Sequence, residues 1–170
     1  GCGNIISGIT YNDSASDISY AGLFGKADSS STIELLGLVD CTFSSNSTSG
    51  STKIGAIVGY SNGLISNCYS KSVVRALNTS NTLAAGGLVG ELGVEGSLTG
   101  CYARPNNQGT TGSVIEGTNP LYSYVQEGND DYYGGILVGI NRGNINACYH
   151  TGVYYLPISS EITYAKYGIL

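Results

Sequence analysis

Basic residues are scarce in this sequence of 170 residues. It holds only seven lysines and arginines against twelve aspartates and glutamates, which gives a formal net charge of −5 at pH 7. A nucleic-acid-binding surface needs clustered lysine and arginine to neutralise a row of phosphates. Because the seven basic residues are scattered along the chain, we expect no nucleic-acid partner.

Long apolar runs and long helix-forming runs are also missing. The longest apolar stretch, at 132–140, is far shorter than the ~20 residues of a membrane-spanning helix, so we expect no membrane-spanning segment. Short apolar stretches bounded by Gly, Asn, Ser and Thr recur instead, among 26 glycines and only three prolines. This pattern is typical of strands and tight turns, and it predicts an all-β fold.

Residues that commonly carry catalysis are few. His150 is the only histidine and has no identifiable acid or nucleophile beside it, so we expect a hydrogen-bonded surface residue. The carboxylates are spread along the chain, and the sequence does not show whether two of them meet, as a glycosidase requires. We therefore expect no catalytic residue, no cofactor and no metal site.

A short glycine-anchored block occurs four times. The copies are AGLFG at 21–25, GAIVG at 55–59, GGLVG at 86–90 and GILVG at 135–139. Their closing glycines are 34, 31 and 49 residues apart, which fits a stacked repeat with an excursion of about 15 residues before the fourth copy. We expect a single domain over 1–170, a fragment of a longer protein, with repeat blocks near 20–43, 54–75, 85–102 and 134–155.

Each copy is expected to supply three short strands, as in a right-handed parallel β-helix (β-solenoid) of about four coils. In the second copy, Asn62-Gly63 is expected to form a turn with positive φ. In the third copy, Arg104-Pro105-Asn106-Asn107 is expected to replace the third strand. Stacking would lay like residues on one another in three ladders: Leu23, Ile57, Leu88 and Leu137; Phe24, Val58, Val89 and Val138; and Leu38, Ile65, Leu98 and Ile145.

Two features of these ladders require explanation, because successive residues of a strand point to opposite faces. Leu88 and Val89 are adjacent, so either the backbone turns a corner there or the outer side is covered, for example by the excursion between 102 and 134. Ile65 and Cys68 are three residues apart, so both face inward only if the strand bends between them.

Four cysteines recur at one position of the repeat: Cys41, Cys68, Cys101 and Cys148. Their spacing differs from that of zinc sites, and parallel strands hold Cβ vectors parallel, which is poor geometry for a disulfide. We expect buried free thiols. Gly1-Cys2 is compatible with a lipidated N-terminus and equally with an arbitrary fragment boundary.

Tyrosines are the candidates for a binding surface. If the cysteines face inward, Tyr69, Tyr102 and Tyr149 stack on the outside, either as a strip for sugar rings or a protein, or as cover for the coil edges. The excursion gathers further tyrosines beside Glu127, and it is either a carbohydrate or calcium site or an ordinary polar loop. The predicted binding residues are Tyr122, Tyr124, Tyr132, Tyr133, Tyr149, Asp130 and Asp131.

The stretches GGLVG at 86–90 and GNINACYHTG at 143–152 resemble the GLUG repeat of bacterial surface proteins. That repeat occurs in large adhesins such as filamentous haemagglutinin-like proteins and in certain immunoglobulin A peptidases, where it is accessory to a separate catalytic domain. The resemblance covers about 20–153 and implies a secreted or surface-exposed β-solenoid stalk or adhesion region without catalytic residues.

We therefore expect a non-catalytic extracellular or cell-surface module for adhesion or structure. Its expected partner is a host or matrix glycan or protein, together with other domains of the same protein. The alternative is a β-helical carbohydrate-active enzyme or carbohydrate-binding module. Two carboxylates, or a carboxylate with an Arg or Lys, converging in a cleft would favour that alternative.

Overall fold

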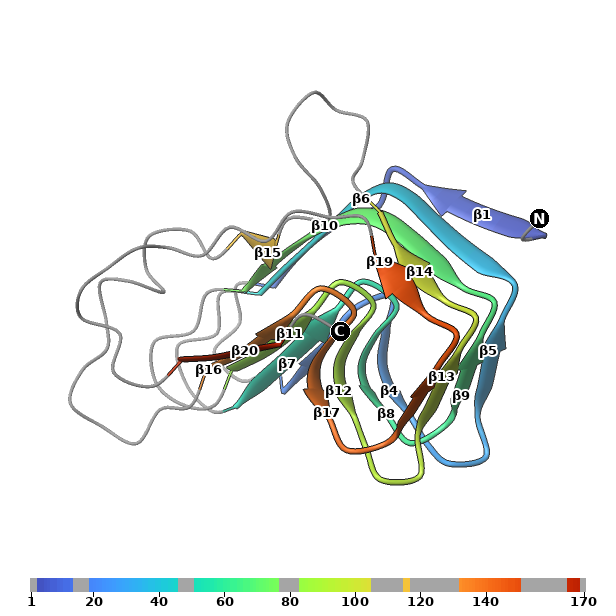
Figure 1. The fold of residues 1–170 in the computed structure, drawn as a ribbon. Coiled ribbons are helices and arrows are strands. Elements are labelled where there is room, and N and C mark those ends of the chain that lie inside the picture. The colour runs from blue at the N-terminus through green and yellow to red at the C-terminus, as the bar shows by residue number, and fades with distance from the viewer. Residues whose placement is uncertain are drawn as a thin grey trace.

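The computed structural model describes residues 3–13, 19–45, 51–76, 83–104, 115–116, 132–150 and 165–168. These residues contain no helix and form four sheets of parallel strands, seen along the stack in Figure 1. The prediction of an all-β fold is confirmed. The arrangement of parallel sheets is compatible with a β-solenoid.

Each sheet takes strands from successive copies of the repeat. Sheet A contains β1 (Asn4–Ser7), β2 (Thr10–Asp13), β6 (Leu36–Ser45), β10 (Tyr69–Ala76), β14 (Tyr102–Ala103), β15 (Ile115–Glu116) and β19 (Tyr149–His150). Sheet B contains β3 (Tyr20–Ala21), β7 (Thr52–Gly55), β11 (Leu83–Gly86), β16 (Tyr132–Gly135) and β20 (Ala165–Gly168). Sheet C contains β4 (Phe24–Ala27), β8 (Val58–Ser61), β12 (Val89–Leu92) and β17 (Val138–Asn141), and sheet D contains β5 (Thr32–Glu34), β9 (Leu64–Ser66), β13 (Ser97–Thr99) and β18 (Asn144–Asn146).

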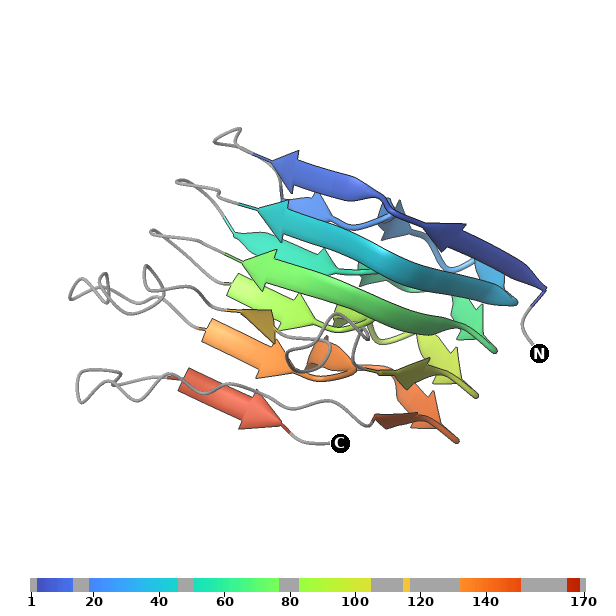
Figure 2. The ribbon, with the colours of Figure 1, turned by 90° about the horizontal axis from the view of Figure 1, so that it is seen from above.

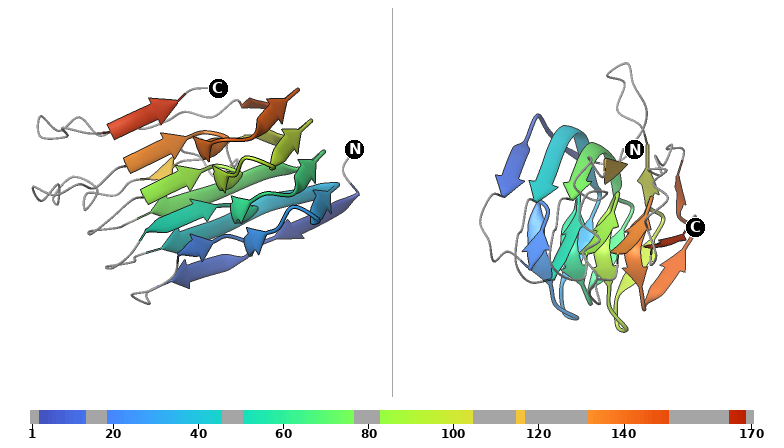
Figure 3. Two further views of the ribbon diagram at one scale, coloured as in Figure 1. Left: turned by 90° about the horizontal axis from the view of Figure 1, so that it is seen from below. Right: turned by 90° about the vertical axis from the view of Figure 1, so that its left-hand side faces the viewer.

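Strands of one sheet lie side by side in sequence order of the copies, from blue at the N-terminal end to red at the C-terminal end (Figure 2). Within one copy the chain runs through sheets B, C, D and A in turn, and then returns to sheet B beside its previous strand (Figure 3). Each strand inside a sheet is therefore paired with strands of the neighbouring copies.

The glycine-anchored block forms the corner between sheets B and C. Ile57 and Val58 are both fully buried, which the corner makes possible, so the first of the two explanations for adjacent buried residues holds. A Cβ on Gly59 would lie 2.7 Å from the Lys53 carbonyl oxygen, and one on Gly55 would lie 2.6 Å from the Val58 carbonyl oxygen. The two anchoring glycines are needed because the backbones of sheets B and C pass too close for a side chain.

Two of the predicted ladders have the predicted members. Leu23, Ile57, Leu88 and Leu137 occupy the successive corners, linked by backbone hydrogen bonds such as Leu88 N–H to the Leu137 carbonyl at 3.0 Å. Phe24, Val58, Val89 and Val138 pair in register along sheet C. The shared block sequence therefore sets the register.

The third ladder was predicted with one wrong member. Ile33, not Leu38, pairs with Ile65, and the ladder continues through Leu98 and Ile145 in sheet D. Leu38 lies in sheet A, where it pairs with Ile6 and Ser70. The first copy thus has a short turn at 28–31 between β4 and β5, followed by an ordinary strand in sheet D.

The bend expected between Ile65 and Cys68 is present. Both side chains are fully buried, and Asn67 between them has a φ of 52°. Equivalent positions of the other copies are also left-handed: Leu35 at 56°, Gly100 at 63° and Ala147 at 50°. In each copy, one residue with a left-handed backbone conformation thus turns the chain from sheet D into sheet A. The turn keeps the side chains at the positions of Ile65 and Cys68 inward.

Cys41 belongs to a different bend from the other cysteines. It follows Asp40, which has a φ of 52°, inside the long strand β6. Gly37 pairs with Tyr69, so Leu36 and not Cys41 takes the position of Cys68. Two bends of the same local form explain why aliphatic-to-cysteine spacing alone placed Cys41 wrongly.

Two local predictions also require correction. The third copy still contributes strands here, because β14 pairs with Tyr69 and Ser70, and β15 with Val74 and Arg75, while 105–107 lie outside the described residues. Gly63 does not adopt a positive φ. It is glycine because a Cβ there would lie 2.7 Å from the Asp28 carbonyl oxygen of the preceding copy.

Candidate functional site

The predicted binding residues fall into three groups. Tyr122, Tyr124, Asp130 and Asp131, with Glu127, lie outside the described residues. Tyr132 and Tyr133 were expected in the excursion, but both lie in β16 and pair with Leu83 and Ala84 of sheet B. Tyr149 lies in β19 and is 45% exposed.

The three tyrosines that follow the cysteines form a stacked row along sheet A. The ring centroids of Tyr69 and Tyr102 are 4.9 Å apart with planes at 4°, and those of Tyr102 and Tyr149 are 5.1 Å apart with planes at 14°. A Cβ on Gly37 would collide with the Tyr69 ring, so the row begins over a glycine. The predicted stacking is confirmed.

The stacking decides which ring faces are available. Tyr69 is only 8% exposed, because it lies between Gly37 and Tyr102. The Arg104 guanidinium lies 5.1 Å from the Tyr102 centroid and donates a hydrogen bond of 3.3 Å to the Tyr149 hydroxyl. The faces of Tyr69 and Tyr102 are thus occupied by neighbours, which favours the interpretation of these two rings as cover for the coil edges.

The cysteines of the second to fourth copies form a row of free thiols. The Cys68 N–H donates to Cys101 Sγ and the Cys101 N–H donates to Cys148 Sγ, each at 3.4 Å. Cys41, Cys68 and Cys101 are buried as predicted, whereas Cys148 is partly exposed because no described strand of the next copy covers it.

Hydrogen bonding between neighbouring thiols separates their acidities. The thiol hydrogen bond between Cys101 and Cys148 raises the pKa of Cys101 and lowers the pKa of Cys148 to about 6. The Cys101 N–H adds to the lowering at Cys148, because it donates to the same sulfur. Cys148 is the partly exposed member and is therefore the reactive thiol of the row.

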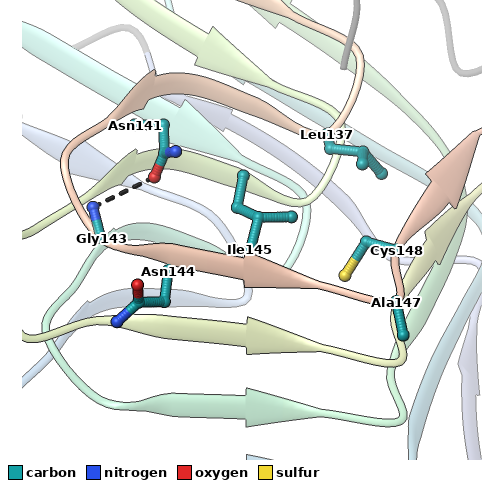
Figure 4. Close-up of a pocket in the computed structure, with 7 residues that line it drawn as sticks. All are labelled: Leu137, Asn141, Gly143, Asn144, Ile145, Ala147 and Cys148. Carbon is teal, nitrogen blue, oxygen red and sulfur yellow. Dashed lines mark hydrogen bonds between the residues drawn. The ribbon is translucent and has the colours of Figure 1, made fainter.

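A pocket of about 470 Å³ lies at the open end of the stack (Figure 4). It is lined by Leu137, Asn141, Gly143, Asn144, Ile145, Ala147 and Cys148. Its strands β17 and β18 end sheets C and D among the described strands. Ile145 and Cys148 occupy positions that the next copy covers elsewhere in the stack, so the pocket lies where the described strands of sheets C and D end, and no carboxylate lines it.

His150 is not the surface residue that the sequence suggested. It is half-buried and continues the inward row of sheet A formed by Leu38, Ser70 and Ala103, which are themselves fully buried. Its Nδ1 atom is buried and has no hydrogen-bond partner among the described contacts. Alternation along β19 explains the placement, because Tyr149 faces outward.

A second cluster, which the sequence analysis did not identify, joins the outer faces of sheets B and C. Glu91 is 7% exposed, and its Oε2 lies 3.0 Å from Lys53 Nζ while its Oε1 accepts a bond of 3.1 Å from Arg142 Nε. The Tyr20 and Tyr60 rings lie 5.8 Å apart, and Lys53 Nζ is 5.3 Å from each ring centroid. We call Tyr20, Lys53, Tyr60, Glu91 and Arg142 the crease cluster.

The sequence did contain a signal for this cluster. Lys26, Tyr60 and Glu91 each stand two residues after a member of the Phe24 ladder, and they pair in register along sheet C. Tyr20 and Lys53 pair in the same way along sheet B. Residues two apart share a face of a strand, so these positions lie on the same side of sheet C as the Phe24 ladder. The contacts of Lys53 with Glu91 and with the Tyr60 ring show that the rows of sheets B and C meet beyond the corner formed by the glycine-anchored block.

The crease cluster brings together a carboxylate, a lysine and an arginine, one of the features expected of a carbohydrate-active site. Both oxygens of Glu91 are held by cations, however, and the neighbouring Asp28 is an exposed residue paired with Lys26 at 3.1 Å. A glycosidase needs one carboxyl group that donates a proton and a second that stays charged. The geometry is better suited to binding than to acid–base chemistry.

Comparison with protein families, with curated proteins and with solved structures found no match for this chain. Within the part of the chain that the structure describes, no helix has the length and apolar character needed to cross a membrane. No group of three or more His, Cys, Asp or Glu residues there is placed to hold a metal ion.

Proposed function

We propose that this chain is a non-catalytic structural and adhesion module of a secreted or cell-surface bacterial protein. Its stack would be a right-handed parallel β-helix of about four coils, because connections between parallel strands are right-handed in about 98% of cases. The observation that carries the proposal is the in-register alignment of all four blocks at Phe24, Val58, Val89 and Val138.

Each type of repeated residue has a structural role in the stack. Gly59 and its equivalents allow two backbones to pass, the aliphatic residues fill the core, and the left-handed residues turn the chain. Such a stack extends in one direction and presents its outward rows to solvent, which is the form of a stalk. The resemblance to GLUG repeats agrees with this proposal and with a glycan or protein ligand.

A second candidate function is a carbohydrate-binding module, and the crease cluster favours it. Tyrosine rings beside charged hydrogen-bonding groups are the usual elements of a surface that holds sugars. A β-helical glycosidase would need a further carboxylate near Glu91. Asp28 is already paired with Lys26 and is exposed.

An adhesion assay tests the proposal. Beads coated with the chain should adhere to a glycan and extracellular-matrix array, while the soluble chain should release no product from a panel of polysaccharides. The control is a Gly59→Val variant, in which the corner is blocked. Polysaccharide cleavage that is abolished by Glu91→Gln would replace the proposal by the enzyme alternative.

A further inference from the structure

The crease cluster keeps more unused hydrogen-bond donors than acceptors, because its one carboxylate is buried and already accepts from two cations. Each oxygen of Glu91 is engaged by one cation. Arg142 uses only its Nε–H in the described contacts, its side chain is 59% exposed, and a guanidinium carries five donors. Lys53 is also a threefold donor with a single described ion pair. Two cations and one anion leave the cluster with one net positive charge.

The donors stand beside aromatic rings. Tyr20 and Tyr60 are both half-buried, and their rings meet at 56°. Lys26 extends the row along sheet C, 5.9 Å from the Tyr60 centroid. Its pairing with Asp28 is between exposed groups, so it is weak and easily exchanged for another anion.

The cluster is also held in place before any ligand arrives. Lys53, Glu91 and Arg142 come from the second, third and fourth copies, so the two ion pairs cross three neighbouring strand layers. Lys53 and Glu91 project from strands, and the backbone N–H of Arg142 is bonded to the Leu92 carbonyl at 2.8 Å. Groups fixed in this way lose little conformational entropy on binding.

We propose that the crease cluster binds the carboxylate of an acidic sugar, such as a uronic acid unit of a polysaccharide. The remaining N–H groups of Arg142 would receive the carboxylate in a bidentate pair, with Lys53 beside it and the tyrosines against the sugar ring. This inference names the ligand class for the proposed adhesion module and rests on that function. A neutral sugar is a poorer fit, because it offers no charge to pair with Arg142 and its hydroxyl groups meet few free acceptors beside the buried Glu91 carboxylate.

Calorimetric titration with oligogalacturonate tests the inference. Arg142→Gln should weaken binding about tenfold or more, because it removes a charge-assisted pair at an exposed position. Arg142→Lys should weaken binding to an intermediate degree, since it keeps the charge but loses the planar fork. Lys71→Gln, which removes an equal charge from sheet A, is the matched control and should bind as the unchanged chain does.

Circular dichroism of each variant shows whether the stack is intact, so that a loss of binding is read only from folded protein. Carboxyl-reduced oligogalacturonate, which is neutral, should bind at least tenfold more weakly. No binding of the acidic oligomer, equal binding of the neutral one or of polyglutamate, or no effect of Arg142→Gln would each overturn the inference. Beads that adhere without dependence on acidic sugars would overturn it while leaving the adhesion function standing.

Discussion

Truncating Ile65 tests whether the stack depends on its internal ladders. Ile65 is fully buried and lies between Ile33 and Leu98. Replacing it by alanine removes three carbons, about 2.4 kcal/mol of transfer free energy. A residual cavity of roughly 50 Å³ adds about 1.2 kcal/mol. Strands on both sides limit collapse, so Ile65→Ala should lower the free energy of unfolding by about 3.5 kcal/mol.

The neighbouring residue provides the control. Leu64 precedes Ile65 in β9, faces outward and is 40% exposed, so Leu64→Ala should cost about 1 kcal/mol or less. Urea unfolding followed by circular dichroism gives both values, with the midpoints compared at equal slope. Equal losses for the two variants would refute the assignment of Ile65 to the interior and of Leu64 to the surface.

Three further predictions follow from the contacts described above. Gly59→Val should unfold the chain or strongly lower its melting temperature. Gly25→Val is the control and should be tolerated, because a Cβ at Gly25 has its nearest contact at 3.5 Å. A tolerated Gly59→Val would contradict the close approach of the backbones of sheets B and C. Iodoacetamide should modify Cys148 in the folded chain with half-maximal rate near pH 6, because the lowered pKa of this thiol leaves the thiolate populated above that pH. Cys101, whose pKa is raised, should react only after unfolding. Peptide mass spectrometry measures both modifications. Glu91→Gln should destabilise the fold by about 2 kcal/mol in a thermal melt by leaving two cations unpaired, and an unchanged melt would show that the ion pairs add nothing.

Much of the fold could be predicted from the sequence, because each block has similar residues that pack in the same way. Val58, Val89 and Val138 pair as predicted since each stands before the same closing glycine. Leu38 was assigned wrongly because two bends share one local form, and residue spacing alone does not distinguish them. The residue that belongs to this ladder is Ile33, which lies in β5 after the short turn that follows β4.

The candidate site was much less predictable. Lys53, Glu91 and Arg142 are far apart in the sequence and share no residue type, so only the register of the sheets brings them together. Tyr133 stands where the neighbouring copies have Ala84 and Lys53, so no shared residue type marks it as part of sheet B. Sequence repetition therefore predicts the positions that need the same residue type in every copy. It does not predict the role of outward positions whose residue type differs between copies.

Those differing outward positions are where the stack can acquire a binding function while its inward ladders stay unchanged. In sheet C the residue at one position of the copy changes from Lys26 to Tyr60, Glu91 and Ile140, while the glycine before it is the same in all four copies. Because the ion pairs of Glu91 span three copies, a ligand held by Lys53 and Arg142 would contact neighbouring layers at once. A ligand that binds only the stacked form must stabilise it, so binding at the crease cluster and the integrity of the stack are thermodynamically linked.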